Sequence, residues 1–257
     1  MTGPARASLF GVRLASVGFM LGGWVVLSWL LQTPKLDLFP SPWRAAMRGF
    51  ELAHSELGRD TLASLEEAAG GWLIGSLLGI ALGLIIGRFA LARLLLRPVI
   101  DFLRFISPLA WVPLAILWFG IGYWSKASII VLISLFTVVV NTVHGVSAIE
   151  REVVKASQSL HLHWWQRLEV VLMSAMPDIL LGLRYSLGAS WGGVVIAELV
   201  AGEVGIGALE SYGGQAFDVA QIMVGMVVLA ALGYLANFAF MQGQRRLFPW
   251  IVSNRRT

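Results

Sequence analysis

The sequence has no cysteine among its 257 residues, and only 13% of its residues are charged. The missing cysteine excludes disulfide bridges, thiol chemistry and cysteine-ligated metal sites. Hydrophobic residues make up 57% of the chain and its mean hydropathy is +0.76, too apolar for an ordinary soluble domain. This composition predicts a protein of the lipid bilayer.

Motifs for nucleotides, metals and catalysis are also absent. The phosphate-binding pattern G-x-x-x-x-G-K-[ST] does not occur, and the four histidines do not form an H-E-x-x-H pattern. His161 and His163 are two residues apart, so they would point to different sides of a helix, which argues against a metal site. No nucleophile motif joins serine, histidine and an acid. We therefore expect no catalysis, no cofactor and no metal in this chain, and a membrane enzyme is disfavoured.

Six apolar segments have about the 20 residues that a helix needs to cross the hydrocarbon core. They predict an all-α integral membrane protein with one transmembrane domain over residues 1–257, and with spans near 14–31, 68–87, 102–121, 127–146, 179–201 and 221–241. No A-x-A-like cleavage site follows the first segment, so we expect it to be a retained helix. The third contains Pro108 and Pro113, which must kink it or leave part of it non-helical.

The positive charges predict the orientation. With six spans, most lysine and arginine residues fall on the side that holds both termini and the segment 150–177. The opposite side has only Lys126 between spans three and four, and none between spans five and six. The segment 32–67 on that side has four, but it holds six acids as well and is long enough to weigh little in the rule. By the positive-inside rule, both termini and the segment 150–177 are cytoplasmic. The net charge of +4 does not indicate nucleic-acid binding, because the cations flank apolar segments and form no stripe.

Residues 150–177, here called the polar segment, are rich in charge yet keep apolar residues at helical spacing. This pattern predicts an amphipathic helix at the membrane surface that serves as a docking surface; the alternative is an ordinary surface loop. On the other side, Arg44–Leu65 has the pattern of an amphipathic helix. The glycine-rich residues 202–218 form either a re-entrant cap or a flexible loop.

Four residues are candidates for a translocation path. Two prolines that bracket Trp111, next to Ser107, would leave free carbonyl groups and an aromatic wall at membrane depth. Arg184 and Glu198 are ionisable groups inside the fifth span, where charge is costly. The alternatives are that Arg184 reaches the interface or pairs with Asp178, and that Glu198 makes a hydrogen bond between helices. A proton-coupled secondary carrier that uses Glu198 is a second hypothesis for the function.

Three stretches together resemble a known family. They are S-P-L-A-W-V-P-L at 107–114, K-A-S-Q-S-L-H at 155–161 and G-L-R-Y-S-L-G-A-S-W at 182–191. In combination they are similar to permeases of binding-protein-dependent ABC importers, in the branch for nitrate, sulfonate, taurine and bicarbonate. The resemblance covers about residues 60 to 250. It implies a path for a small solute such as one of these anions, located in the cell (inner) membrane.

The resemblance also implies partners. Such permeases pair as homodimers, bind two cytoplasmic ATP-hydrolysing subunits that hold Mg-ATP, and receive solute from an extracytoplasmic binding protein. The polar segment would carry the family's E-A-A-x-x-x-G loop, a coupling helix between the fourth and fifth spans. Here lysine, serine and histidine replace its Glu, second Ala and Gly. The coupling residues implied are Lys155, Ala156, Ser157, Gln158, Ser159, Leu160, His161 and Trp164.

Overall fold

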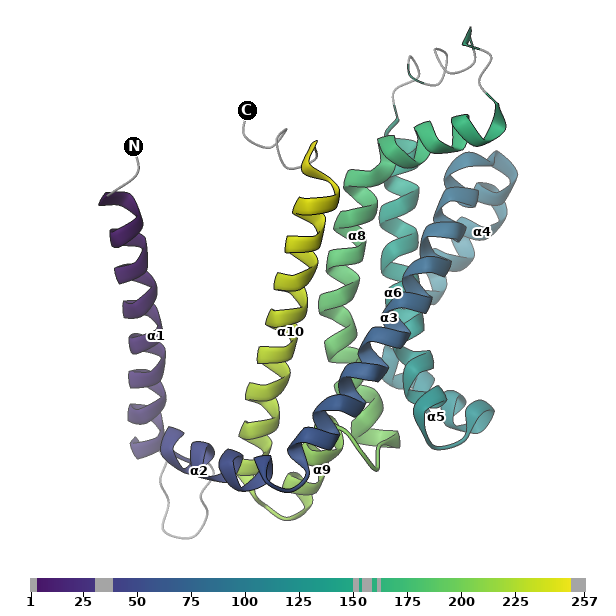
Figure 1. Ribbon diagram of the computed structural model, residues 1–257. Coiled ribbons are helices and arrows are strands. Elements are labelled where there is room, and N and C mark those ends of the chain that lie inside the picture. Colours follow the sequence, from purple (N-terminus) through teal and green to yellow (C-terminus); the bar gives the residue numbers. More distant parts are fainter. Residues whose placement is uncertain (1–3, 31–38, 150–152, 154–158, 161–162, 251–257) are drawn as a thin grey trace.

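The computed structural model describes residues 4–30, 39–149, 153, 159–160 and 163–250, and throughout this part of the chain the regular elements are helices. One end of the molecule holds the start of α1 (Pro4–Leu30) and the end of α10 (Val219–Leu247) (Figure 1). The end of α6 (Tyr123–Ser147) and the start of α8 (Trp164–Ala201) lie there too. We call this the loop end. At the opposite end, the α9 end, α2 (Pro42–Ala53) and α9 (Ile206–Gln215) lie across the long helices (Figure 1).

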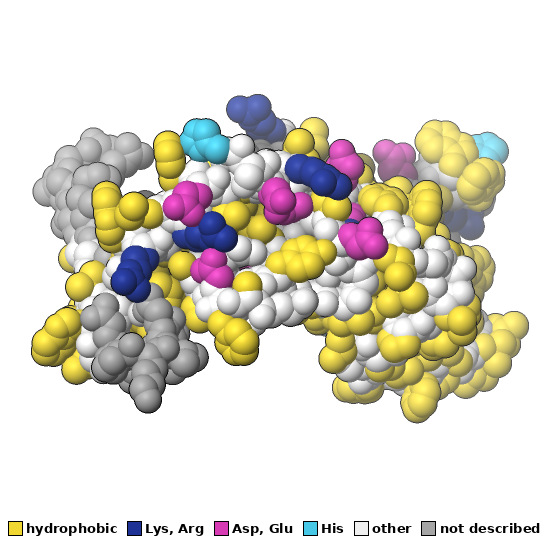
Figure 2. Space-filling model, turned by 90° about the horizontal axis from the view of Figure 1, so that it is seen from below, with side chains coloured by type: hydrophobic (Ala, Val, Ile, Leu, Met, Phe, Trp, Pro, Cys, Tyr) yellow, Lys and Arg dark blue, Asp and Glu magenta, His cyan; other side chains and the backbone are white. Residues whose placement is uncertain are grey.

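Four described helices are long and apolar enough to cross a bilayer: α3 (Leu57–Arg88), α6, α8 and α10. They contain the second, fourth, fifth and sixth predicted spans, whose helical character is confirmed. α1 covers residues 14–30 of the first predicted span, and its apolar stretch is the shorter Gly18–Leu30. The α9 end, by contrast, carries acidic and basic side chains across its middle, between hydrophobic flanks (Figure 2).

The third predicted span, 102–121, is not a single straight helix. This part of the chain is a pair of helices, α4 (Ala90–Leu103) and α5 (Pro108–Phe119), bent by 99° relative to each other. Pro108 stands in the first turn of α5, where its missing N–H is not needed, and it disfavours helix at the residue before it. The prolines do interrupt the segment, as the sequence indicated. The first helix of the pair begins at Ala90, ahead of the predicted boundary at 102.

Two further segments differ from the expected boundaries. The predicted helix over 44–65 is divided at 54–56, where α2 ends and α3 begins. Residues 202–218, which the sequence left open, contain α9 packed against α8 and α10.

In the polar segment, the part from Trp164 onward is helical and continues through Pro177 into the fifth span as the single helix α8. Figure 1 shows the first turns of α8 running across the loop end before the helix enters the bundle. Pro177 lacks a backbone N–H and supplies a physical cause for this change of direction.

Close packing of α3 on α6 organises the bundle. Every fourth residue along one face of α3 is a glycine, namely Gly71, Gly75, Gly79, Gly83 and Gly87. A Cβ added at any of them would lie 2.8 Å or less from an atom of α6. Only glycine therefore lets the two backbones approach this closely, as in the small-residue interfaces common between membrane helices.

The glycine stripe generates a prediction for stability. In Gly75→Ala the new methyl group would overlap the carbonyl oxygen of Val131 and lie 2.8 Å from Cβ of Ser134. Overpacking typically costs about 1–3 kcal/mol, whereas the gain in helix propensity is roughly 1 kcal/mol. We therefore expect a net loss of up to about 2 kcal/mol. The measurement is the thermal unfolding midpoint of the purified protein in detergent.

Gly22→Ala is the matched control, because Gly22 is also helical but has no neighbouring atom within 4 Å of an added Cβ. Its midpoint should stay unchanged or rise. Equal midpoints for both variants would contradict the role of the stripe.

Candidate functional site

A buried carboxylate joins three helices at the α9 end. Glu198 of α8 is fully buried, its Oε1 accepts a hydrogen bond from Ser64 Oγ of α3 (2.7 Å), and its Oε2 accepts from the backbone N–H of Gly207 (2.6 Å). Ser64 Oγ in turn accepts from the N–H of Ile206 at 2.9 Å. Of the two roles that the sequence left open for Glu198, this geometry favours hydrogen bonding between helices.

The same contacts complete the N-terminus of α9. The N–H of Gly205, its N-cap residue, donates to Asp60 Oδ1 at 3.2 Å. Three backbone N–H groups that the start of a helix leaves unpaired are thus bound by side chains of α3 and α8. Acidic groups at this position also interact favourably with the positive end of the helix dipole. Gly205 has φ of 131°, and a Cβ there would overlap the Glu198 carboxylate. The position requires glycine for both reasons.

Lys126 belongs to this cluster. The sequence suggested that it is a surface cation in the connection between spans three and four, but in the structure it is buried. It lies buried in the first turn of α6, forms an ion pair with the buried Glu67 of α3, and donates from Nζ to the carbonyl of Val204 at 3.0 Å. The ion pair connects α3 to α6, and the hydrogen bond to Val204 connects both helices to the turn that precedes α9. Breaking such a buried pair by removing one partner typically costs about 3–5 kcal/mol.

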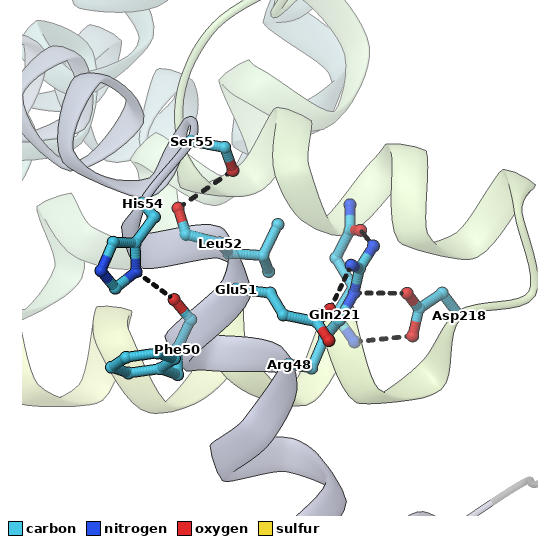
Figure 3. Close-up of polar contacts among 8 residues, drawn as sticks. All are labelled: Arg48, Phe50, Glu51, Leu52, His54, Ser55, Asp218 and Gln221. Atoms are coloured by element: carbon cyan, nitrogen blue, oxygen red, sulfur yellow. Dashed lines mark hydrogen bonds and ion pairs between the residues drawn. The ribbon is translucent and has the colours of Figure 1, made fainter.

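A second polar cluster, centred on Arg48 of α2, holds α2 against α10. Arg48 donates from Nε to Asp218 Oδ2 (2.8 Å) and from Nη2 to Gln221 Oε1 (3.0 Å), and it pairs with Glu51 on its own helix (Figure 3). Asp218 also caps α10, accepting the N–H of Gln221 at 3.0 Å. The Gln221 amide donates to the carbonyl of Leu209 at 2.8 Å, which ties α9 to the same point.

The Trp111 hollow lies between α5, α6 and the bend that joins α4 to α5. Its volume is about 480 Å³, and its walls are mostly apolar side chains of α5 and α6, Trp111 among them. Thr137 and Asn141 of α6 add polar groups, and Arg104 lies at the bend. The aromatic wall expected from the sequence therefore lines a real cavity.

Sequence reasoning missed Arg104, although it falls inside the predicted third span, where a charge is itself a signal of function. Its Nε lies 3.3 Å from Asp101 Oδ1, and its guanidinium lies 5.0 Å from the centre of the Phe105 ring. This places a cation beside an apolar cavity, an arrangement suited to a small anion.

The four proposed path residues do not form one cluster. Trp111 lines the hollow, and Ser107, the N-cap of α5, is exposed at the bend. Arg184 does not line this hollow; it donates from Nε to Asn237 Oδ1 of α10 at 3.0 Å, while Asp178 lies against His144. Glu198 lies in the buried cluster at the start of α9.

The coupling residues are only partly described. Lys155, Ala156, Ser157, Gln158 and His161 lie outside the described residues. Ser159 and Leu160 precede α8, and Leu160 and Trp164 are 70% and 76% exposed. Large apolar side chains this exposed at the loop end offer a contact surface to lipid or to a partner chain.

Comparison with known proteins identifies the family. The family described as binding-protein-dependent transport system inner membrane component matches residues 75–253. A probable ABC transporter permease protein of Brucella melitensis is 32% identical over 248 residues, which cover 96% of this chain and 99% of the relative. The chain belongs to this family of ABC importer permeases. A putative aliphatic sulfonates transport permease protein of Bacillus subtilis is 31% identical over 250 residues, 96% of the permease and 88% of the relative.

The fold agrees with this assignment. The permease matches a chain of the MetNI methionine ABC transporter, in inward-facing conformations, with a TM-score of 0.65 over 74% of the permease and 95% of that chain, at 17% sequence identity. The expected family and the all-α membrane fold are thus confirmed. The permease is a multi-pass membrane protein of a family of non-catalytic transporter subunits.

Glu210 of α9, outside the spanning helices, makes stability depend on pH. Gly225 of α10 leaves room for its side chain, whose buried Oε1 has no hydrogen-bond partner among the described residues. Burial, with a contribution from the charge of Glu198, raises the pKa of Glu210 from 4.5 to about 7. Between these values the folded protein keeps a proton that the unfolded chain releases, so the free energy of unfolding falls as pH rises.

We therefore expect the unfolding midpoint of the permease to decrease between pH 5 and pH 8 relative to that of Glu210→Gln, which fills the same space without titrating. Thermal unfolding across this range measures the difference. Parallel midpoint curves for the two proteins would rule out Glu210 as the titrating group.

Proposed function

We propose that the permease forms the translocation path for a small anion, working as a homodimer with two ATP-binding subunits and an extracytoplasmic solute-binding protein. Hydrolysis of Mg-ATP on those subunits supplies the energy. The substrate class is supported by the relative named for aliphatic sulfonates and by the cation beside the Trp111 hollow.

The observation that carries this proposal is the position of Arg104 at the bend beside that hollow. Arginine binds oxyanions such as sulfonate through a planar fork of N–H groups, and an apolar surrounding strengthens the attraction. Trp111 and Ile133 provide surface for the apolar part of an organic anion, while Thr137 and Asn141 offer polar groups. Ser107, three residues after Arg104, is exposed at the bend. A second permease would close the open side and bring Arg184, exposed on α8, towards a shared axis.

Removing the cation should slow transport. Because a hydrogen bond to a charged group contributes about 1.5–3 kcal/mol, we expect Arg104→Gln to reduce the uptake rate by roughly tenfold or more. Uptake of radiolabelled alkanesulfonate, taurine and bicarbonate is measured in proteoliposomes that contain the permease, its ATP-binding subunits and the binding protein.

Arg97→Gln is the control, because Arg97 lies on α4, the helix that Arg104 follows, and also pairs with Asp101, at 3.7 Å, but does not line the hollow. It should transport at nearly the rate of the unmodified protein. If the two variants lose uptake equally, Arg104 acts through its pairing with Asp101 and not through the substrate.

The loop end is assigned to the cytoplasm, where the ATP-binding subunits bind. Supporting this are the positive charges flanking the spans at this end, including Arg245 and Arg246 in the last turn of α10, and the exposed Leu160 and Trp164. α8 joins that contact surface to the bundle directly. Closure of the ATP-binding subunits would therefore move the start of α8 and favour one arrangement of the two permeases over the other.

The absence of native cysteine allows a clean test of orientation. In Leu160→Cys we expect labelling by a membrane-impermeant maleimide in inverted vesicles and none in intact cells, with Ala216→Cys, exposed after α9, showing the reverse. Bound ATP-binding subunits should protect position 160 and leave position 216 unprotected. Labelling of position 160 from outside intact cells would refute the coupling role.

The alternative of a proton-coupled carrier has less support. A carrier would need Glu198 to meet water during transport, yet its two oxygens are occupied by Ser64 and Gly207 and its side chain is fully buried. Uptake that follows a pH gradient and needs no ATP would favour the carrier.

A further inference from the structure

A second hollow lies at the loop end, between the end of α3 and the first turns of α8. Its volume is about 560 Å³. Leu84 and Ile85 of α3 form one side, and Leu168 and Val171 of α8 form the other. It shares no residue with the Trp111 hollow.

Two arginines border this apolar hollow. Arg88 is the last residue of α3, and Arg167 lies in the first turn of α8; both are exposed and line the hollow. Within the part of the chain that the structure describes, neither guanidinium has an ion-pair or hydrogen-bond partner. Arg93, nearby in sequence, is different: it is occupied by the carbonyl groups of Ile86 and Gly87 at the end of α3.

The depth of the hollow in the membrane limits what can fill it. Leu84 and Ile85 belong to the last apolar turns of a spanning helix, and Arg88 follows one turn later, where hydrocarbon gives way to headgroups. Trp164, also in the lining, is exposed at the same end, as is typical of an interface anchor. The hollow thus combines an apolar wall at acyl-chain depth with two free cations at headgroup depth.

We propose that this hollow binds one anionic phospholipid. Its phosphate group lies between Arg88 and Arg167, and one acyl chain lies against Leu84, Ile85, Leu168 and Val171. Basic pockets between membrane helices are known to select such headgroups, whereas a free inorganic anion would gain nothing from the apolar wall. The lipid connects α3 to the start of α8, the element that meets the ATP-binding subunits under the proposed function, although the lipid site itself does not depend on that function.

Native mass spectrometry of the full-length permease in non-ionic detergent tests the proposal, with phosphatidylglycerol and phosphatidylcholine of identical acyl chains as probes. We expect the first phosphatidylglycerol to bind at least tenfold more tightly than phosphatidylcholine. The double variant Arg88→Gln/Arg167→Gln should lose roughly 30-fold in phosphatidylglycerol affinity, since each basic residue near an anionic headgroup contributes about one factor of five. Its affinity for phosphatidylcholine should stay unchanged.

The charge-matched control is Arg245→Gln/Arg246→Gln, which removes two exposed cations at the end of α10 that do not line the hollow. This variant should retain the preference for phosphatidylglycerol. Leu168→Asp, which places a carboxylate in the apolar wall, should weaken both lipids. The unfolding midpoint of each variant verifies that it is folded, and a variant that unfolds is replaced by Arg88→Lys/Arg167→Lys, which should keep the preference.

Three results would overturn the proposal. The first is equal binding of the two lipids, or equal loss in the two arginine double variants. The second is displacement of phosphatidylglycerol by inorganic phosphate at millimolar concentration, which would indicate a site for a free anion. The third is its release on addition of the ATP-binding subunits, which would identify the hollow as part of a protein interface.

Discussion

Close contact between the backbones of α3 and α6 is the constraint on which the other features depend. The glycines of α3 remove every side chain between the two helices at four-residue intervals, so α6 is fixed in both distance and register. With α6 fixed, Lys126 in the first turn of that helix forms its ion pair with Glu67 of α3. α6 also contributes Ile129, Ile133 and Thr137 to the lining of the Trp111 hollow. A shift of one residue along this interface would turn both groups away from their partners.

The polar cluster at the α9 end extends the same rigid unit. Asp60 and Ser64 precede the glycine stripe on α3, and they bind the first N–H groups of α9 together with Glu198 of α8. In an apolar surrounding, each unpaired group of such a network would cost about 1–3 kcal/mol, so α9 is expected to move with α3 and α8.

The sequence predicted the long helices well because apolar length is a direct consequence of bilayer thickness. At 102–121 the prolines indicated an interruption, but the sequence did not show that the helix before it begins at Ala90 or that α4 and α5 are bent by 99°. The sequence predicted an aromatic wall at Trp111, which lines the hollow. It did not single out Arg104, because this cation stands within an otherwise apolar run. The partners of Glu198 could not be predicted, since Ser64 lies 134 residues away in the chain and the hydrophobic pattern gives no information on such pairs.

α8 connects the two ends of the molecule as one covalent element. Its 38 residues correspond to a contour length of roughly 57 Å at 1.5 Å per residue, from Trp164 at the loop end to Ala201 beside α9. A helix transmits displacement along its axis because its backbone hydrogen bonds resist stretching, but Pro177 removes one of these bonds near the loop end and permits bending there. Displacement of Trp164 is therefore divided between bending at Pro177 and movement of the rigid part that carries Glu198. The packing of Ala175 and Ile179, on either side of Pro177, against Val146 of α6 limits the bending and so determines how much of the displacement reaches the α9 end.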